Sequence, residues 1–249
     1  MSRVRKDTLV VSVMHVNNET GIIQPVYEIG EALQERNVLF HVDATQSFGK
    51  LVEELRKVKY NMLSMSAHKL GGPQGIGALI LRKQGYKLPP VKAIMYGGQQ
   101  EHGIRPGTLP VALIAGLGKA CEIAEKEYKD NTRICQEIKE KIKSMLEESG
   151  LKYKYNGFQE YAIPSTVNVC LDGVSSEALM LSSKEFCGIS NGSACNSKSY
   201  DPSYVLLAMG IPENEIESSV RISWGHDIKI NEFEELFQSV IESAKKLVW

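Results

Sequence analysis

The sequence predicts a protein of the α/β class, with a mainly parallel sheet and helices in its first half and a smaller α+β domain at its carboxyl end. Two observations support this prediction. Apolar runs alternate with helical patterns over about the first seventy residues, which is the order expected of a parallel sheet. From about residue 111 the chain is charged and helical, and it then returns to a strand and a final helix. We therefore expect two domains, residues 1–120 and residues 121–249, that meet inside a helical connector.

The elements of the first domain follow from local patterns. Leu9–Val16 is apolar and β-branched without polar alternation, so it predicts a strand buried on both faces. Pro25 is expected to open a helix, because proline suits the first helical turn. Two further buried strands are expected at Val38–Val42 and Met62–Ser66. Gly97–Pro110 is rich in Gly and Pro and predicts a long ordered loop, which in a compact domain is usually functional.

The second domain is expected to be helical on both sides of a strand. An apolar stripe of four residues runs along the predicted helix at 111–149: Ile134, Ile138, Ile142 and Met145. Thr166–Leu171 alternates like a half-buried strand. The final helix is expected to begin with Asn231 as its N-cap, and Glu234 three residues later resembles the second half of a capping box.

Composition excludes several classes of function. A net charge of −1 and a pI near 6.5 give no basic excess, so neither nucleic acid nor an anionic membrane is expected as a partner. No apolar run is long enough to cross a bilayer, and the start lacks a secretory cleavage site. The number of cysteines is odd and no CxxC pair occurs, which favours reduced thiols in the cytoplasm over disulfides or a zinc site. The five cysteines are Cys121, Cys135, Cys170, Cys187 and Cys195.

Lys69 is the first candidate catalytic residue. It follows a predicted strand and precedes Gly-Gly-Pro, so it is expected at the carboxyl end of the sheet, where open α/β folds bind ligands. A desolvated lysine there would have a lowered pKa and could act as an amine nucleophile that forms a Schiff base. Ser66 and His68 flank it with hydrogen-bond donors suited to a phosphate. A surface lysine on a glycine turn is an equal alternative.

Three further residues have side chains suited to an ionic ligand. Asp43 follows a buried strand, and its carboxylate could keep a pyridinium nitrogen protonated; the alternative is that it caps the next helix. Asn18, in a run after the first strand, could bind a ring hydroxyl or a carboxylate, although this segment by itself favours an ordinary turn. Arg221 lies in a short apolar strand, where either a substrate carboxylate or an internal acidic residue would balance its charge.

Cys195 is the only cysteine whose surroundings suggest reactivity. Small polar residues surround it from Ser190 to Ser197, and exposure is a prerequisite for a reactive thiol. The other four cysteines lie in predicted helices or strands or beside Phe186, and each is interpreted as a small core residue.

Six motifs occur in the order and spacing of a known family. They are VNNETG, VDATQ, SAHKLGGPQGIGAL, RPGTLP, NGSACNS and RISWG. Together they resemble the cysteine desulfurases of the NifS/IscS group, which belong to the class V branch of the fold-type I aminotransferases. The resemblance runs from about Asp7 to the final helix. It implies that residues 1–120 are part of the large domain that binds pyridoxal 5′-phosphate, and that residues 121–249 are the small domain with the cysteine loop.

The resemblance implies a role for each matching residue. Lys69 would carry the cofactor and later move the Cα proton, and Cys195 would take sulfur from L-cysteine as a persulfide, leaving L-alanine. Asn18 and Arg221 would hold the substrate carboxylate. The remaining residues would bind the cofactor's nitrogen, hydroxyl and phosphate: Asp43, Gln46, Ser66, His68, and Thr108 of a second subunit. A homodimer is implied, with a sulfur acceptor such as an iron–sulfur scaffold protein as a further partner.

The family's N-terminal portion has no counterpart in these 249 residues. In the family that portion supplies a phosphate-binding loop and a histidine that stacks on the cofactor. Two alternatives therefore accompany the desulfurase prediction. One is another class V enzyme, such as a selenocysteine lyase. The other is a catalytically inactive paralogue that serves as a binding or dimerisation partner.

Overall fold

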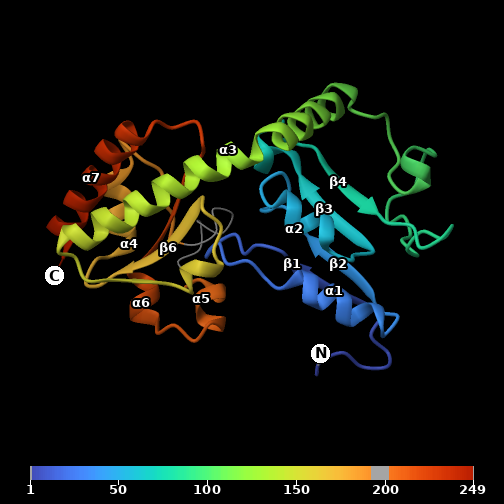
Figure 1. Cartoon of the computed structure of the whole chain (residues 1–249), viewed down its shortest axis with the longest axis horizontal. Coiled ribbons are helices and arrows are strands. Elements are labelled where there is room, and N and C mark those ends of the chain that lie inside the picture. The colour runs from blue at the N-terminus through green and yellow to red at the C-terminus, as the bar shows by residue number, and fades with distance from the viewer. Residues whose placement is uncertain (1, 192–201, 249) are drawn as a thin grey trace. The chain divides into compact units, whose positions relative to one another are not determined.

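The computed structural model describes residues 2–191 and 202–248. The chain forms two compact units (Figure 1). The first unit comprises Met1–Val16 and Gln24–Tyr128, and the second comprises Asn17–Ile23 and Lys129–Trp249. The short segment Asn17–Ile23, which follows the first strand, thus belongs to the second unit.

A four-stranded sheet forms the centre of the first unit. Its strands are β1 (Val10–Met14), β2 (Leu39–Asp43), β3 (Met62–Ser66) and β4 (Gly77–Leu81), in that order across the sheet. The first three strands are parallel, as the sequence predicts, and β4 runs antiparallel to β3. The predicted third strand is confirmed, and β2 begins one residue later than expected.

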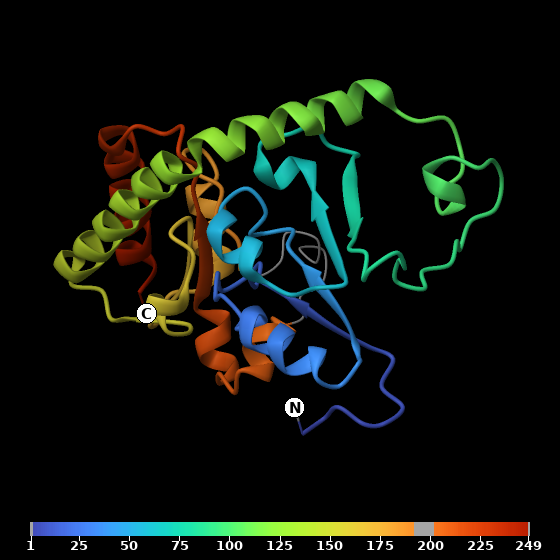
Figure 2. The same cartoon turned by 45° about the vertical axis from the view of Figure 1, so that its right-hand side comes forward.

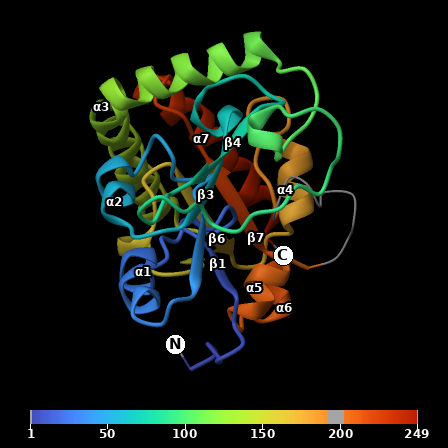
Figure 3. The ribbon, with the colours of Figure 1, turned by 90° about the vertical axis from the view of Figure 1, so that its right-hand side faces the viewer.

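Two helices cover one face of this sheet (Figure 3). The first, α1 (Val26–Gln34), begins directly after Pro25, as predicted, and α2 (Val52–Lys57) follows β2. Gly30 lets α1 approach the loop before β3, because a Cβ at this position would lie 2.8 Å from the carbonyl oxygen of Lys59. The buried apolar side chains of this face form one core: Val26, Leu33, Phe40, Val42, Ala44, Leu55, Val58, Leu63 and Met65.

The opposite face of the sheet is open to solvent. We call it the open face, and its exposed apolar side chains are Val10, Met14 and Leu79. At its centre the His41 ring lies between two hydroxyls: its Nδ1 is 2.8 Å from Ser12 Oγ and its Nε2 is 3.1 Å from Ser64 Oγ. The prediction of a fully buried first strand is therefore wrong. Strand β1 alternates between exposed and half-buried residues because helices cover only one of its faces.

A long connection and a long helix complete the first unit. The connection from β4 runs out from the sheet before it reaches α3 (Figure 2). The predicted Gly97–Pro110 loop is confirmed, with one short 3-10 helix, η2 (Glu101–Gly103), inside it. The helix α3 (Val111–Ser149) has 39 residues, and the chain passes from the first unit to the second within it, after Tyr128.

The second unit contains an antiparallel sheet in the order β5 (Tyr153–Tyr155), β6 (Thr166–Leu171) and β7 (Ser219–Ser223). All six residues of β6 are buried, so the predicted half-buried alternation is wrong. Its polar positions are nevertheless inside, because the side chains on the face away from the apolar core find hydrogen-bond partners there. The Asn168 side chain, for example, is hydrogen-bonded to Asn156 and to the backbone of Glu19.

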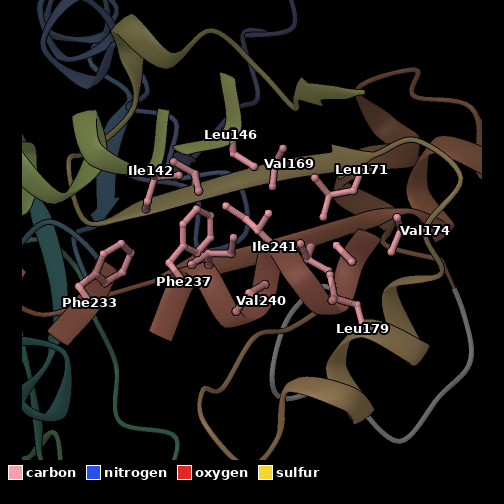
Figure 4. Close-up of a cluster of buried hydrophobic side chains, with 14 of the residues drawn as sticks. Ile142, Leu146, Val169, Leu171, Val174, Leu179, Phe233, Phe237, Val240 and Ile241 are labelled. Carbon is pink, nitrogen blue, oxygen red and sulfur yellow. The ribbon is translucent and has the colours of Figure 1, made fainter. Parts of the chain in front are cut away.

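Helices pack around this second sheet. They are α4 (Ser176–Ser183), α5 (Tyr204–Ala208), α6 (Glu213–Glu217) and α7 (Ile230–Leu247), with a 3-10 helix, η3 (Gln159–Tyr161), before β6. Phe233, Phe237, Val240 and Ile241 of α7 face Val169 and Leu171 of β6, and Ile142 and Leu146 of α3, in one apolar core (Figure 4).

The start of α7 differs from the prediction. The N-cap position is Lys229 and has no side-chain cap, so the helix begins before Asn231. Glu234, predicted as part of a capping box, is instead 3.0 Å from Lys141 Nζ of α3 in an ion pair. The long apolar stripe of α7 fixes this helix by packing, so a local cap is not needed to define its start. Among the described residues, no helix is long and apolar enough to span a membrane.

Candidate active site

Predicted site residues gather at the carboxyl edge of the first sheet. Met14 pairs with Asp43, and Asp43 pairs with Ser64 on the next strand, so the parallel strands end nearly level. Asp43 is the last residue of β2, and Ser66 is the last residue of β3. Open α/β sheets bind ligands outside the carboxyl ends of their strands. The fold of the first unit therefore brings Asp43 and Ser66 to the edge where such a ligand would lie.

The Asp43 carboxylate is held by the turn that follows β2. Its Oδ1 accepts a hydrogen bond of 2.9 Å from the backbone N–H of Thr45. Gln46, which is half-buried, lies in the same turn. The alternative that Asp43 caps the next helix is wrong, because α2 begins only at Val52, after Leu51. The short bond to Thr45 fixes one carboxylate oxygen and orients the side chain at the end of the strand.

A single 3-10 turn, η1 (Ala67–Leu70), carries the next group of residues. Ser66 Oγ lies 2.8 Å from Nδ1 of His68, so the two predicted phosphate ligands are already joined to each other. Gly71 closes the turn with φ of 83°, a left-handed conformation that favours glycine, and its N–H donates to the carbonyl of Ala67. Lys69 projects from this fixed turn, three residues beyond the end of β3.

The side chain of Lys69 is exposed, and so is that of His68. The sequence predicts a lysine desolvated at the end of a strand, and the described residues do not provide that enclosure. The turn follows directly from β3 and ends at Gly71. No described element of the first unit packs over the side chains of His68 and Lys69. The backbone places Lys69 just beyond the end of β3, and burial of its side chain would require further contacts.

His15 also lies at the end of a strand, although no sequence motif indicates a role for it. It follows β1 directly, its N–H donates to the carbonyl of Asp43 at 2.8 Å, and its side chain is only 2 % exposed. Its Nδ1 is buried and has no hydrogen-bond partner among residues 2–191 and 202–248, and burial lowers the pKa of the imidazole below its usual value. The one feature of the sequence that could have indicated His15 is its position directly after the first strand.

In the second unit, Asn18 and Arg221 meet. Arg221 lies in β7 opposite Asn168, and its Nη1 donates a hydrogen bond of 2.9 Å to the backbone carbonyl of Asn18. Both residues are half-buried. The acceptor of this bond is a neutral backbone carbonyl. The pair predicted to hold a substrate carboxylate is thus side by side, although the two residues are 203 positions apart.

The cysteines divide as the sequence predicts, as far as they are described. Cys135 and Cys170 are buried, and Cys121 and Cys187 are half-buried. Burial raises the pKa of the Cys121, Cys170 and Cys187 thiols, which disfavours the thiolate form. Cys135 and Cys170 are thus buried as predicted, whereas Cys121 and Cys187 pack against the two apolar cores but are only partly buried. Cys195 lies outside the described residues. Thr108, predicted to reach a second subunit's cofactor, is exposed in the connection before α3.

Comparison with known proteins places this geometry in a family. A family model described as aminotransferase class-V matches residues 1–236. A curated relative, the cysteine desulfurase IscS of Proteus mirabilis, is 42% identical over 224 residues, which are 89% of this chain and 54% of the relative. The chain spans 54% to 60% of the length of the curated relatives it matches.

Two solved structures resemble the chain closely. One, described as a NifS-like protein, gives a TM-score of 0.86 at 30% identity and covers 99% of this chain and 64% of that one. The other, described as SspA in complex with cysteine, gives a TM-score of 0.71 at 35% identity and covers 89% of this chain and 60% of that one. About two-fifths of each neighbour thus has no counterpart here.

Proposed function

The chain belongs to the class-V aminotransferase family, and from this membership we propose that it supplies the lysine, the ring-binding carboxylate and the sulfur-accepting cysteine of a cysteine desulfurase that depends on pyridoxal 5′-phosphate. The observation that carries the proposal is the common edge at which Asp43, Ser66 and Lys69 lie. The curated relatives that it resembles are named as cysteine desulfurases.

The residues at this edge suit the proposed cofactor. Asp43 has one oxygen held by Thr45 and would place the carboxylate against the pyridinium nitrogen. The joined Ser66 and His68 would donate to the phosphate, with Thr108 of a second subunit beside them, and Gln46 would bind the ring hydroxyl. Asn18 is also predicted to bind the cofactor. When bound, the cofactor withdraws electrons from the substrate's Cα.

Lys69 and the substrate-binding pair have distinct tasks. The Lys69 amine would attach the cofactor and afterwards carry a proton to and from Cα, which requires the mobility that its exposed position allows. Arg221 and Asn18 would hold the carboxylate of L-cysteine, because they lie side by side and a guanidinium can bind a carboxylate in two places. A neighbouring solved structure is described as a complex with cysteine, which supports this choice of substrate.

Cys195 would receive the sulfur. Its thiolate would form an S–S bond to the substrate sulfur while the Cβ–S bond breaks. The electron pair would remain with the carbon, which then takes up a proton, so that the products are L-alanine and a persulfide on Cys195. A sulfur-acceptor protein, such as an iron–sulfur scaffold, would take the persulfide. We further propose a homodimer in a reducing cytoplasm, consistent with the free thiols among the described cysteines.

A second candidate function is favoured by the open face and by the exposed Lys69. An inactive chain that binds or dimerises with a sulfur-transfer protein would keep the fold without enclosing the lysine. Another class V activity, such as that of a selenocysteine lyase, would use the same lysine. These candidates differ in whether the chain binds the cofactor and in which substrate it cleaves.

One experiment separates these candidates. The purified chain is loaded with pyridoxal 5′-phosphate, the absorbance band of the lysine-bound cofactor is recorded, and alanine, sulfide and persulfide are measured with L-cysteine and with L-selenocysteine. We expect Lys69→Ala to lose the band, and Cys195→Ala to keep the band but lose the persulfide. Cys187→Ala serves as the matched control. A chain that never gives the band would support the binding-partner function and contradict desulfurase activity of this chain alone.

A further inference from the structure

We propose that Glu19 is a positioning residue that fixes Ser203, at the far end of the interval 192–201 that contains Cys195, next to the proposed substrate ligand Asn18. The inference rests on the proposed function for its role in catalysis. It is carried by contacts in the second unit, among residues that the sequence motifs leave without a role. Glu19 lies between Asn18 and Thr20, and its side chain is only 2 % exposed.

The end of the interval is tied to Glu19 through Ser203. The Ser203 hydroxyl donates a hydrogen bond of 2.5 Å to Oε2 of Glu19. The same hydroxyl accepts a bond of 3.2 Å from the N–H of Leu206, because Ser203 is the N-cap of α5. One hydroxyl thus joins the start of α5 to Glu19, two residues after residues 192–201 end.

The start of the interval is tied to the same segment through Arg221. Ser190 pairs with Arg221 in an isolated antiparallel bridge: the Arg221 N–H donates to the Ser190 carbonyl at 2.5 Å, and the Ser190 N–H donates back at 3.1 Å. The Arg221 side chain in turn donates to the carbonyl of Asn18, the neighbour of Glu19. The residues on both sides of 192–201 therefore converge on two consecutive residues of one short segment.

This short segment, Asn17–Ile23, is itself firmly held. Asn17 Oδ1 accepts hydrogen bonds of 2.9 Å from the N–H groups of Glu19 and Thr20. The buried Asn168 of β6 donates from its side-chain amide to the Glu19 carbonyl at 3.2 Å. A bridge between Ile22 and Ala162 fixes the far end of the segment. The segment that carries Glu19 is therefore itself held in place by hydrogen bonds.

A buried carboxyl group lowers stability unless a hydrogen bond or ion pair compensates for its loss of contact with water. Burying an ionisable group without good partners is unfavourable, and an apolar residue of similar size would fill the space more cheaply. The hydrogen bond to Ser203 explains the choice. Asn18 is the proposed ligand of the substrate carboxylate, so the bond fixes Ser203 and the start of α5 next to that ligand.

The first test needs no cofactor and no substrate. Hydrogen exchange is followed in peptides that cover residues 202–209 and 186–191, in the full chain and in Glu19→Ala, Glu19→Gln and Ser203→Asp. We expect Glu19→Ala to raise exchange in 202–209 by about tenfold, since a hydrogen bond to a carboxylate is lost. Glu19→Gln keeps an acceptor oxygen and should restore protection. Ser203→Asp preserves the helix cap but removes the donor, so it should resemble Glu19→Ala.

The second test asks whether the hydrogen bond between Glu19 and Ser203 contributes to the reaction. In the cofactor-loaded chain we expect Glu19→Ala to lower the kcat of persulfide formation on Cys195 by at least about tenfold, with the KM for L-cysteine and the cofactor band unchanged, and Glu19→Gln to restore it. Trp224 fluorescence checks that each variant keeps the second unit folded. If exchange rises while kcat is unchanged, Glu19 is only structural and the proposal is wrong.

The exchange test and the kinetic test distinguish failure of the Glu19 proposal from failure of the proposed function. If exchange in both peptides is unchanged in Glu19→Ala, Glu19 does not fix Ser203 and the proposal is wrong, whatever the activity. If the parent chain forms no persulfide, the proposed function fails for this chain, and with it the catalytic role of Glu19. The exchange result then still decides whether Glu19 fixes Ser203. If exchange and kcat change together and glutamine restores both, the positioning role is supported.

Discussion

The two sheets of this protein differ in how completely their own units cover them. The central strand of the second sheet, β6, is buried at every position, and its unit closes one apolar core around it. Strand β1 of the first sheet alternates between exposed and half-buried residues, and the open face carries exposed apolar side chains. Parallel sheets are usually covered on both faces. The second unit therefore holds its structure by its own packing, whereas the first unit has a face that would gain stability from a cover.

The largest expected effect is in the core of the second unit. Phe237 is 3 % exposed and stacks on Phe233 with ring centroids 5.7 Å apart. We expect Phe237→Ala to lower the free energy of unfolding of this unit by about 3 to 5 kcal/mol, because a large cavity remains. Both tryptophans of the chain belong to the second unit, so denaturant unfolding followed by tryptophan fluorescence measures it. Leu181→Ala, at a residue 68 % exposed, is the control and should change stability by less than about 0.5 kcal/mol.

The next effect concerns a buried cation in the same unit. Lys139 of α3 is 9 % exposed, and its Nζ donates to the carbonyls of Gln159, Ala162 and Ile163 at 3.2 to 3.4 Å. Burial lowers the pKa of this lysine. We expect Lys139→Met to cost about 1 to 3 kcal/mol of unfolding free energy, because buried carbonyls lose their donor.

The exposed Lys143 on the same helix gives the matched control, Lys143→Met. If Lys139→Met is as stable as this control, apolar packing compensates for the lost bonds, and the ammonium contributes nothing to the closed core. The same fluorescence assay distinguishes the two outcomes.

The sequence predicts the parts of this fold that depend on local patterns. The strand ending at Ser66, the helix after Pro25 and the long helix from 111 to 149 all follow from apolar spacing and breakers. The prediction fails where burial depends on neighbours distant in the chain. Strand β1 has an apolar sequence but one open face, and β6 has polar alternation but is buried because Asn156 and Glu19 satisfy Asn168.

The candidate site divides in the same way. Motif spacing identifies Asp43, Lys69 and Arg221, since each stands at a strand end or in a recognisable segment. The exposure of Lys69 and the contacts of His15 could not be predicted, because both depend on which chain segments surround them in space.

His15 gives the first unit a dependence on pH. Burial lowers the pKa of this histidine in the folded unit. As the pH falls below about 6.5, the unfolded chain therefore binds a proton at His15 more readily than the folded unit does. We expect the first unit to lose stability as the pH falls below about 6.5, by at most about 1.4 kcal/mol per pH unit, until the folded pKa is reached. Hydrogen exchange of β2 and β3 measures this loss. His15→Gln should abolish it, whereas His102→Gln, at an exposed residue of the same unit, should not.

The smallest expected effect tests the open face itself. Leu79 of β4 is 48 % exposed on the open face, whereas Leu63 of β3 is 2 % exposed in the helix-covered core. We expect Leu63→Ser to cost the first unit several kcal/mol, and Leu79→Ser less than about 0.5 kcal/mol, measured by hydrogen exchange of β3. If Leu79→Ser costs as much as Leu63→Ser, the face is covered in solution. The two units would then be equally closed, and the concentration dependence of the effect would tell whether a second molecule provides the cover.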